Sequence, residues 1–361
     1  MKKIFVLICF FATNSSFAQK SDSANLFRIT LLPVVYYSPE TRLGFGGLLG
    51  ANFETVRKPD SVTKTSYIET YILYTVNHQY DGGGQIRLYK PKNKLIFQGK
   101  FNFSHFPEYY FGLQTENPSS HKDTISYYRV SGDTRFYWKV KKNYYTGLAA
   151  RFNQIKNVEA GIGQFEIDKP VGYSGYWIVG IAPAFTYESR DNVVYPRKGA
   201  YIEAVYFVYP SWEGSSYGFN QLRIDARKYF PLKSKSNLNV LAFQFLANLN
   251  TGDVPFKDMA DIGGSNTMRG YYTGFYRYKN LYALQAEYRI HVWNWIGISL
   301  WTGAALTTEK WYAITDHSIK PNAGIGLRLM VNKKDHLNVR VDQGWGNQGQ
   351  KGFYLDIAEA Y

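Results

Sequence analysis

Cysteine is almost absent from this chain of 361 residues, in which Cys9 is the single one. If the N-terminal segment that contains Cys9 is removed, neither a disulfide nor a thiolate site can form. The sequence also lacks, after Gln19, any run of about 18 apolar residues, which excludes a transmembrane helix. Sustained helical periodicity is missing as well. These absences exclude a disulfide scaffold and a bundle of membrane helices.

Charged residues are scarce too, at 19%, whereas apolar residues make up 45%, which excludes a disordered chain. Aromatic residues are abundant, at 18%, yet the mean hydropathy is only −0.34. Alternating strands give this combination, because every second side chain faces a different medium. The composition therefore favours β-structure in an unusual solvent.

The N-terminus carries the features of a signal peptide. Lys2 and Lys3 precede an apolar stretch over 4–12, and Ser16-Phe17-Ala18 forms a small-x-small cleavage site. We therefore expect residues 1–18 to be removed, 19–27 to be a short N-terminal segment, and 28–361 to form a barrel. The formal net charge is +14, and loss of the two lysines would lower it by two.

Period-two alternation recurs along the chain. In one stretch, side chains expected to face lipid alternate with polar ones expected to face the lumen, the former being Tyr282, Leu284, Tyr288 and Ile290 and the latter Gln285, Glu287 and Arg289. Sixteen such strands are predicted, over 28–37, 41–56, 65–78, 80–90, 93–105, 124–138, 142–155, 173–188, 198–209, 217–230, 236–250, 281–292, 296–306, 319–331, 336–344 and 351–361. Tight turns alternate with long connections at 106–123, 156–172, 251–280 and 307–318, as in outer-membrane barrels. The predicted fold class is an all-β transmembrane barrel of about sixteen antiparallel strands.

The C-terminal strand has apolar residues of one parity and ends in an aromatic residue, the set being Phe353, Leu355, Ile357 and Tyr361. Such a strand resembles the signal that outer-membrane assembly machinery recognises. The alternative is an ordinary edge strand.

Three motifs are more specific than the alternation that any membrane barrel shows. The first is a proposed periplasmic turn with Arg190, Asp191, Pro196 and Gly199. The second is Arg269-Gly270-Tyr271 in the longest loop, and the third is Gly324-Ile325-Gly326 leading into Arg340-Val341-Asp342. In this order and spacing the motifs resemble the bacterial surface antigen superfamily of BamA/TamA-like outer-membrane assembly barrels and two-partner secretion transporters.

The resemblance implies that the long loop folds back into the lumen, where Arg269, Gly270 and Tyr271 dock on an acidic inner wall. Glu287 has inward parity on the following strand and is the expected partner of Arg269. Relatives often carry an acid on the strand after that, where Thr302 stands here, so a weaker clamp is expected. The alternative places Arg269 on a solvated loop.

The resemblance also implies a role in protein or lipid insertion, translocation or assembly at the outer membrane of a Gram-negative bacterium. Relatives carry periplasmic POTRA domains before the barrel, which this sequence does not encode, so we expect a barrel-only member. A separate periplasmic or lipoprotein partner would then supply what those domains do. Outer-membrane lipids and the assembly machinery are the other expected partners, and no nucleic acid is expected. A passive pore is the first alternative.

A lipid hydrolase inside the barrel is the second alternative, because such enzymes need a serine and a histidine on one wall. No short catalytic motif surrounds any of the six histidines, His78, His105, His121, His291, His317 and His336. None of them has metal-ligand spacing to another. We therefore expect no catalytic residues, no metal and no cofactor.

Overall fold

The computed structural model describes residues 27–55, 63–193, 195–212, 215–233, 238–313, 319–332 and 336–361. The predicted signal peptide and nearly all of the segment 19–27 lie outside these residues, as does His317.

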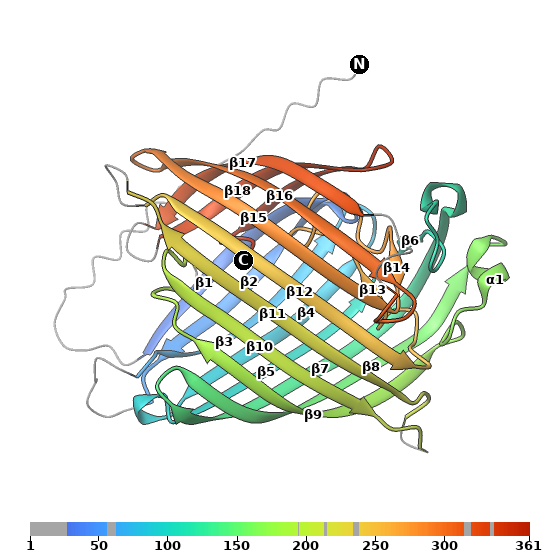
Figure 1. The fold of residues 1–361 in the computed structure, drawn as a ribbon, viewed down its shortest axis with the longest axis horizontal. Coiled ribbons are helices and arrows are strands. Elements are labelled where there is room, and N and C mark those ends of the chain that lie inside the picture. The colour runs from blue at the N-terminus through green and yellow to red at the C-terminus, as the bar shows by residue number, and fades with distance from the viewer. Residues whose placement is uncertain are drawn as a thin grey trace.

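Within the described residues, sixteen strands form one closed antiparallel wall (Figure 1). They are β1 (Phe27–Ser38), β2 (Arg42–Phe53), β3 (Ser66–Thr75), β4 (Tyr80–Tyr89), β5 (Leu95–His105), β7 (Asp123–Lys141), β8 (Tyr144–Ala160), β9 (Tyr176–Glu188), β10 (Gly199–Tyr209), β11 (Phe219–Pro231), β12 (Val240–Gly252), β15 (Asn280–Trp293), β16 (Ile296–Thr308), β17 (Lys320–Asn332), β18 (Leu337–Gly346) and β19 (Lys351–Ile357). Each strand pairs with the next wall strand along the chain, and β19 returns to β1. The predicted all-β barrel of sixteen strands is confirmed, with strand ends displaced by a few residues.

The outer face of the wall is apolar because alternate side chains of each strand point outward. Leu31 in β1, Ile181 in β9 and Leu284 in β15 are 73%, 65% and 57% exposed. Gln285, next to Leu284, is instead 1% exposed. An apolar belt of this kind, broader than a water-soluble protein tolerates, fits the hydrocarbon of a bilayer.

The strand faces predicted for β15 are confirmed. The predicted lumenal residues Gln285, Glu287 and Arg289 are buried, while Leu284 on the other face is exposed. Tyr288 and Ile290 are half-buried, as expected for side chains flanked by neighbours on the outer wall.

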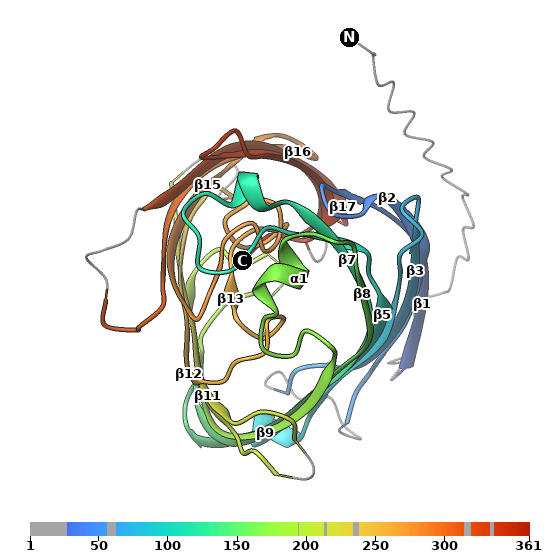
Figure 2. The same ribbon diagram turned by 90° about the vertical axis from the view of Figure 1, so that its right-hand side faces the viewer.

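The long connections gather at one end of the barrel and contain short elements that the sequence patterns did not predict. These are β6 (Glu108–Tyr110), η2 (Pro118–His121), α1 (Gln164–Asp168), β13 (Ala260–Asp261) and β14 (Arg277–Tyr278). Each is too short to show a period. Viewed from this end, α1 and the loop between β12 and β15 lie within the ring of strands (Figure 2). The opposite end has a one-turn 3₁₀ helix, η1 (Pro91–Asn93).

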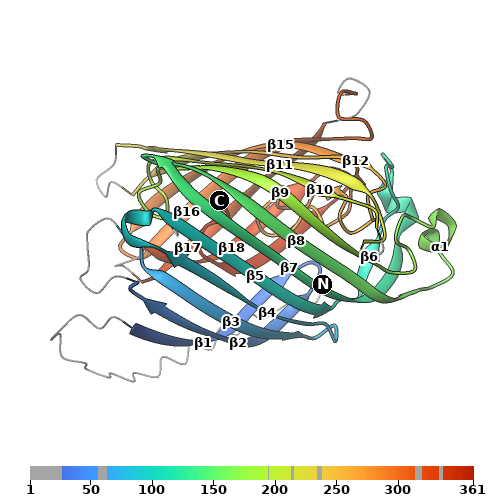
Figure 3. The same cartoon turned by 90° about the horizontal axis from the view of Figure 1, so that it is seen from below.

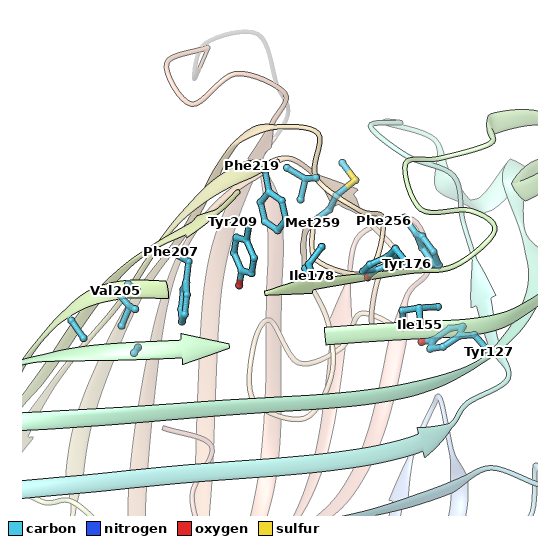
Figure 4. Packing of buried hydrophobic residues seen from close by; sticks show 14 of the residues in the cluster. Tyr127, Ile155, Tyr176, Ile178, Val205, Phe207, Tyr209, Phe219, Phe256 and Met259 are labelled. Carbon is cyan, nitrogen blue, oxygen red and sulfur yellow. The ribbon is translucent and has the colours of Figure 1, made fainter. Parts of the chain in front are cut away.

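The lumen is packed with apolar side chains near the end that carries the long loops. Figure 4 shows Tyr209 of β10 beside Phe219 of β11, and the two rings stack with centroids 4.1 Å apart. Phe256 and Met259, from the loop between β12 and β15, join the same cluster. The loop is therefore held against the inner wall by hydrophobic contacts as well as by polar ones.

Seen from below, β1, β2 and β3 lie along one side of the barrel (Figure 3). The loop after β12 also packs on β15 and β16, since its second cluster includes Leu281 and Ala283 of β15 and Ala305 of β16. The same loop reaches the closure between the first and last strands, because Thr273 N donates to Glu40, in the turn after β1, at 2.7 Å.

Candidate functional site

Arg269, in the loop between β12 and β15, is fully buried inside the barrel. Its Nη1 lies 2.6 Å from Oδ2 of Asp342 in β18, and its Nη2 hydrogen-bonds Oε2 of Glu287 in β15. The guanidinium carbon lies 3.8 Å from the centre of the Trp301 ring in β16. Burial by itself would lower the pKa of Arg269, but Glu287 and Asp342 outweigh it and the pKa is raised, so the side chain stays charged. One loop residue thereby contacts three wall strands.

The residues beside Arg269 fix the loop through backbone groups. Met268 N donates to Gln285 Oε1 at 2.8 Å, and Gly270 N donates to the hydroxyl of Tyr354 at 3.0 Å. Gly270 has φ +115°, and a Cβ there would lie 2.7 Å from backbone atoms of Trp345 in β18. Only glycine combines this backbone conformation with so close an approach.

Tyr271 completes the tip of the loop. Its hydroxyl donates to the carbonyl of Pro321 at 2.6 Å, and its ring is fully buried. Gly346 in β18 makes room for that ring, because a Cβ at this glycine would lie 2.6 Å from ring atoms. The Arg269-Gly270-Tyr271 tip therefore sits in a cradle built from β15 to β19.

Four arginines and four carboxylates form one ion-pair network around this tip, consisting of Arg269, Arg289, Arg328, Arg340, Glu287, Asp342, Asp356 and Glu359. Asp342 accepts from Arg328 at 2.6 Å and from Arg340 at 2.9 Å. Buried charges need such pairing, because a single buried ion loses its hydration without compensation. Equal numbers of both signs leave the network neutral.

The expectation of a weaker clamp was drawn from the neutral Thr302, which does not occupy the position of the second acid. Thr302 has outward parity and is exposed, whereas its neighbour Trp301 faces the lumen opposite Glu287. The second carboxylate comes from Asp342, two strands further along the wall. Arg269 therefore has two acidic partners and an aromatic ring.

The C-terminus departs from the expected single parity. Phe353 and Ile357 are exposed on the outer face, and Leu355 between them is half-buried. Strand β19 ends at Ile357, and Ala358 adopts φ +67°, which ends the alternation. Tyr361 consequently lies buried inside the barrel, where its carbonyl accepts from Arg289 Nη2 at 2.5 Å.

The turn between β9 and β10 is organised by its predicted residues. Asp191 Oδ1 accepts from the backbone N–H groups of Arg197 and Lys198 at 2.9 and 3.3 Å. Arg190 pairs with Glu188 at 2.6 Å, and Gly199 adopts φ +100°. Pro196 is buried. These four residues lie together in the turn, and Tyr195 of the same turn faces Arg289 of the ion-pair network, 6.0 Å from ring centre to guanidinium carbon.

The closure of the barrel is its weakest pairing. Strands β1 and β19 share one register pair, Tyr37 with Leu355, whereas the other adjacent wall strands share six or more. On its other side, β1 pairs with β2 along its whole length. Pro33 stands in the middle of β1, and a residue without an N–H is tolerated in a strand chiefly at an edge. We call this closure the seam.

Other kinds of site find less support in the described part of the chain. None of the described histidine side chains, His78, His105, His291 and His336, hydrogen-bonds a serine hydroxyl, and His78 Nδ1 lies 3.0 Å from the Tyr74 hydroxyl. No group of three or more metal-ligating side chains occurs among the described residues. Among those same residues, no helix is long and apolar enough to cross a membrane.

A closed sixteen-stranded wall, an apolar outer belt and a loop docked inside the lumen define an outer-membrane-type β-barrel. Residues 75–360 match the Omp85 superfamily domain, and the chain belongs to that superfamily. Together, family and fold indicate the outer membrane of a Gram-negative bacterium.

Solved structures show the same fold at low identity. BamA from Haemophilus ducreyi lacking POTRA domains 1–3 matches with a TM-score of 0.58 and 13% identity, over 93% of this chain and 70% of that one. CdiB from Acinetobacter baumannii matches with a TM-score of 0.57 and 10% identity, over 94% of this chain and 61% of that one. CdiB from Escherichia coli gives 0.57 and 10%, over 91% and 62%. No curated protein sequence matches the chain.

Proposed function

We propose that this barrel inserts or translocates proteins or lipids at the outer membrane, without catalysing a chemical reaction, and that the seam is where its wall opens. The observation that carries the proposal is the single register pair between β1 and β19. A backbone hydrogen bond contributes about 1 kcal/mol, so a nearly unpaired strand boundary costs far less to separate than its neighbours.

The edge strand itself supports this role. β1 exposes Ile29, Leu31 and Val35 on its outer face, with exposed fractions of 64%, 73% and 54%. An edge strand with free backbone groups is a template on which another strand can pair. A client strand that added to β1 or β19 would meet both a hydrogen-bonding edge and a lipid-facing apolar row.

The Arg269 clamp has a complementary role in the proposal. It ties the loop to β15, β16 and β18, on the wall that leads to the seam. We infer that the clamp keeps this half of the barrel rigid, so that opening is confined to the seam. The lumen of the barrel is partly filled by the docked loop and its apolar clusters, which argues against a passive pore.

A disulfide across the seam tests the proposal. Tyr37→Cys combined with Leu355→Cys places two cysteines at register partners, and the chain after Gln19 contains no other. In proteoliposomes, oxidation should slow the folding of an added, urea-unfolded outer-membrane barrel, scored by its heat-modifiable gel mobility. Reduction should restore the rate.

The matched control joins two strands that are fully paired. Ile68 and Ile86 are register partners in β3 and β4, so Ile68→Cys with Ile86→Cys forms the same bond away from the seam. This disulfide should leave the folding rate unchanged. Equal rates for the oxidised and reduced seam variant would refute a role for the seam, and ion conductance through the oxidised barrel would favour the pore.

Export and partners complete the proposal. We propose that residues 1–18 are cleaved as a signal peptide, that the apolar C-terminal residues Phe353, Leu355 and Ile357 take part in recognition by the assembly machinery, and that a separate periplasmic or lipoprotein partner presents the client. N-terminal sequencing of the outer-membrane form should begin near Gln19. Cross-linking from the turn 189–198 should capture the partner on the periplasmic side.

A further inference from the structure

A polar cavity of about 450 Å³ lies in the lumen, on the wall away from the clamp. Its sides are the inner faces of β5, β7, β8, β11 and β12, and residues 257–261 of the loop before β15 also line it. Cavities of this size hold small ligands in many proteins. The lining is strongly basic, with the six cations Lys100, Arg129, Arg135, Arg151, Arg223 and Lys257.

Three of these six cations already have acidic partners. Arg135 and Arg151 both bind Asp133, at 2.8 and 2.7 Å, and Arg135 also binds Glu203. Lys257 pairs with Glu108 at 2.7 Å. Asp133 is the register partner of Lys100 on the neighbouring strand. Its carboxylate pairs with Arg135 and Arg151 instead of Lys100.

The other three cations have no carboxylate within ion-pair distance among the described residues. Arg129 donates to the amide oxygen of Asn153 at 2.9 Å, while the side chains of Lys100 and Arg223 form no hydrogen bond or ion pair in the described part of the chain. Both of these side chains are exposed within the barrel rather than packed. This contrasts with the clamp network, where every arginine has an acid.

One acid of the lining is also without a cationic partner. Asp258 Oδ2 accepts from the Tyr176 hydroxyl at 2.6 Å and from Asn153 Nδ2 at 2.8 Å, which fixes the loop over the cavity. Gln221 adds to this frame, since its Nε2 donates to the carbonyl of Asp258 at 3.2 Å. The cavity therefore has three unpaired cations and one unpaired carboxylate, which leaves two positive charges uncompensated. The hydrogen bonds of Asp258 hold the lining in place.

We propose that this cavity binds a phosphate group, either free or as a phosphomonoester on a lipid headgroup. Such a phosphate carries about two negative charges at neutral pH, which matches the uncompensated charge, whereas a single carboxylate would neutralise half of it. The guanidinium groups of Arg129 and Arg223 present paired donors suited to phosphate oxygens, and Lys100 adds a compact charge. This site is independent of the seam, so it would exist whether or not the proposed function holds.

Pyrophosphate is the soluble probe, titrated by calorimetry into the full chain in a phosphate-free sugar detergent at constant ionic strength. The variant Lys100→Gln with Arg223→Gln should bind at least about tenfold more weakly, because it removes two cationic hydrogen-bond donors from the site. The control Lys142→Gln with Lys228→Gln removes the same charge from side chains that do not line the cavity and should bind normally.

Native mass spectrometry with added phosphatidic acid, whose headgroup is a phosphomonoester, or with phosphatidylcholine, which has no net charge, tests for a lipid ligand. Pyrophosphate binding that is lost in the cavity variant supports a free phosphate ligand. Retention of phosphatidic acid that is lost in the same variant, without pyrophosphate binding, supports a lipid headgroup. Binding of neither probe, or equal losses in the cavity and control variants, overturns the proposal.

Folding of the cavity variant is checked separately, by heat-modifiable mobility and thermal unfolding. Because Lys100 and Arg223 repel their neighbours without an acid to offset them, their removal should leave the melting temperature unchanged or raise it. Arg223→Lys, which keeps the charge, should retain more affinity than Arg223→Gln. A lowered melting temperature together with equal affinities for these two variants would mean a structural role and would contradict the site.

Discussion

Arg269 Nη1 and Asp342 Oδ2 lie 2.6 Å apart although 73 residues separate them in the chain. The contact joins the tip of a loop to the last wall strand but one. Glu287 holds the other end of the same guanidinium, so the planar fork of arginine is used on both sides. The docked loop is thus tied to the wall by a group that lysine could not replace.

Arg269→Ala should destabilise the barrel strongly. The change leaves Glu287 and Asp342 buried with fewer cations, and breaking a buried ion pair from one side typically costs about 3–5 kcal/mol. Urea-induced unfolding in lipid vesicles, followed by tryptophan fluorescence, measures this loss.

Substitution of the partner residue, Glu287, should also lower the stability of the barrel. Glu287→Gln should give a similar defect, and the double variant should lose less than the two single losses added together, because both remove one interaction. Strict additivity of the two changes would mean that Arg269 and Glu287 act independently, contrary to the geometry.

Much of the fold could be predicted from the sequence because alternation is a local property. The strand predicted over 281–292 followed from the alternation of its own side chains, and it differs from β15 by one residue at each end. The resemblance implied that Arg269 docks on the inner wall, and inward parity on the next strand then selected Glu287 as its partner. Asp342 could not be assigned in this way, because the strand that supplies it is fixed by closure of the whole barrel.

Three features were not predicted correctly. They depend on which strand supplies a side chain, on a backbone irregularity, or on packing between distant strands. Thr302 was considered as an acid position although its parity points outward, and Trp301 beside it contacts Arg269. The inward turn of the C-terminus at Ala358 requires a positive φ at a residue that rarely adopts one. The basic cavity brings together strands that are far apart in sequence, so no local pattern showed it.

Gly270→Ala should impair docking of the loop. The added Cβ would lie 2.7 Å from backbone atoms of Trp345, and φ +115° is a conformation that side chains other than glycine rarely adopt. Gly349→Ala is the matched control, because Gly349 has φ +70° with no atom within 4 Å of the added Cβ. Its cost should be limited to about 1–2 kcal/mol of backbone strain. Protease resistance of the loop measures both variants, and equal sensitivity would argue against the close contact with β18.

Leu284→Arg should cost more than Val292→Arg. Both side chains lie exposed on β15, at 57% and 55%, but Val292 is next to the end of the strand. An arginine on the lipid face costs about 2–4 kcal/mol near the bilayer midplane and about 0–1 kcal/mol near the interface. Equilibrium unfolding in vesicles gives both values. A larger cost at Val292 would mean that the bilayer is centred elsewhere on the strand.

Acidification should release the outer part of the docked loop at Glu108. Glu108 in β6 binds Lys257 at 2.7 Å and lies 3.7 Å from Arg277, both in the loop between β12 and β15. Burial by itself would raise the pKa of Glu108, but Lys257 and Arg277 outweigh it, and the Tyr127 hydroxyl also favours the charged form, so the pKa is lowered.

A carboxyl group whose pKa is lower in the folded protein stabilises the fold above its unfolded pKa, near 4.5, and this stabilisation is lost as the pH falls through the folded value. Hydrogen exchange over residues 253–262 should therefore accelerate below about pH 4.5, beyond the intrinsic change in exchange rate. Glu108→Gln should raise exchange at neutral pH and flatten this dependence. Glu166→Gln is the control, because the exposed Glu166 of α1 pairs with Lys169 at 3.6 Å and forms no ion pair with the loop among the described residues. If Glu108→Gln exchanged like the unaltered protein across this range, the Glu108 pair would not hold the loop.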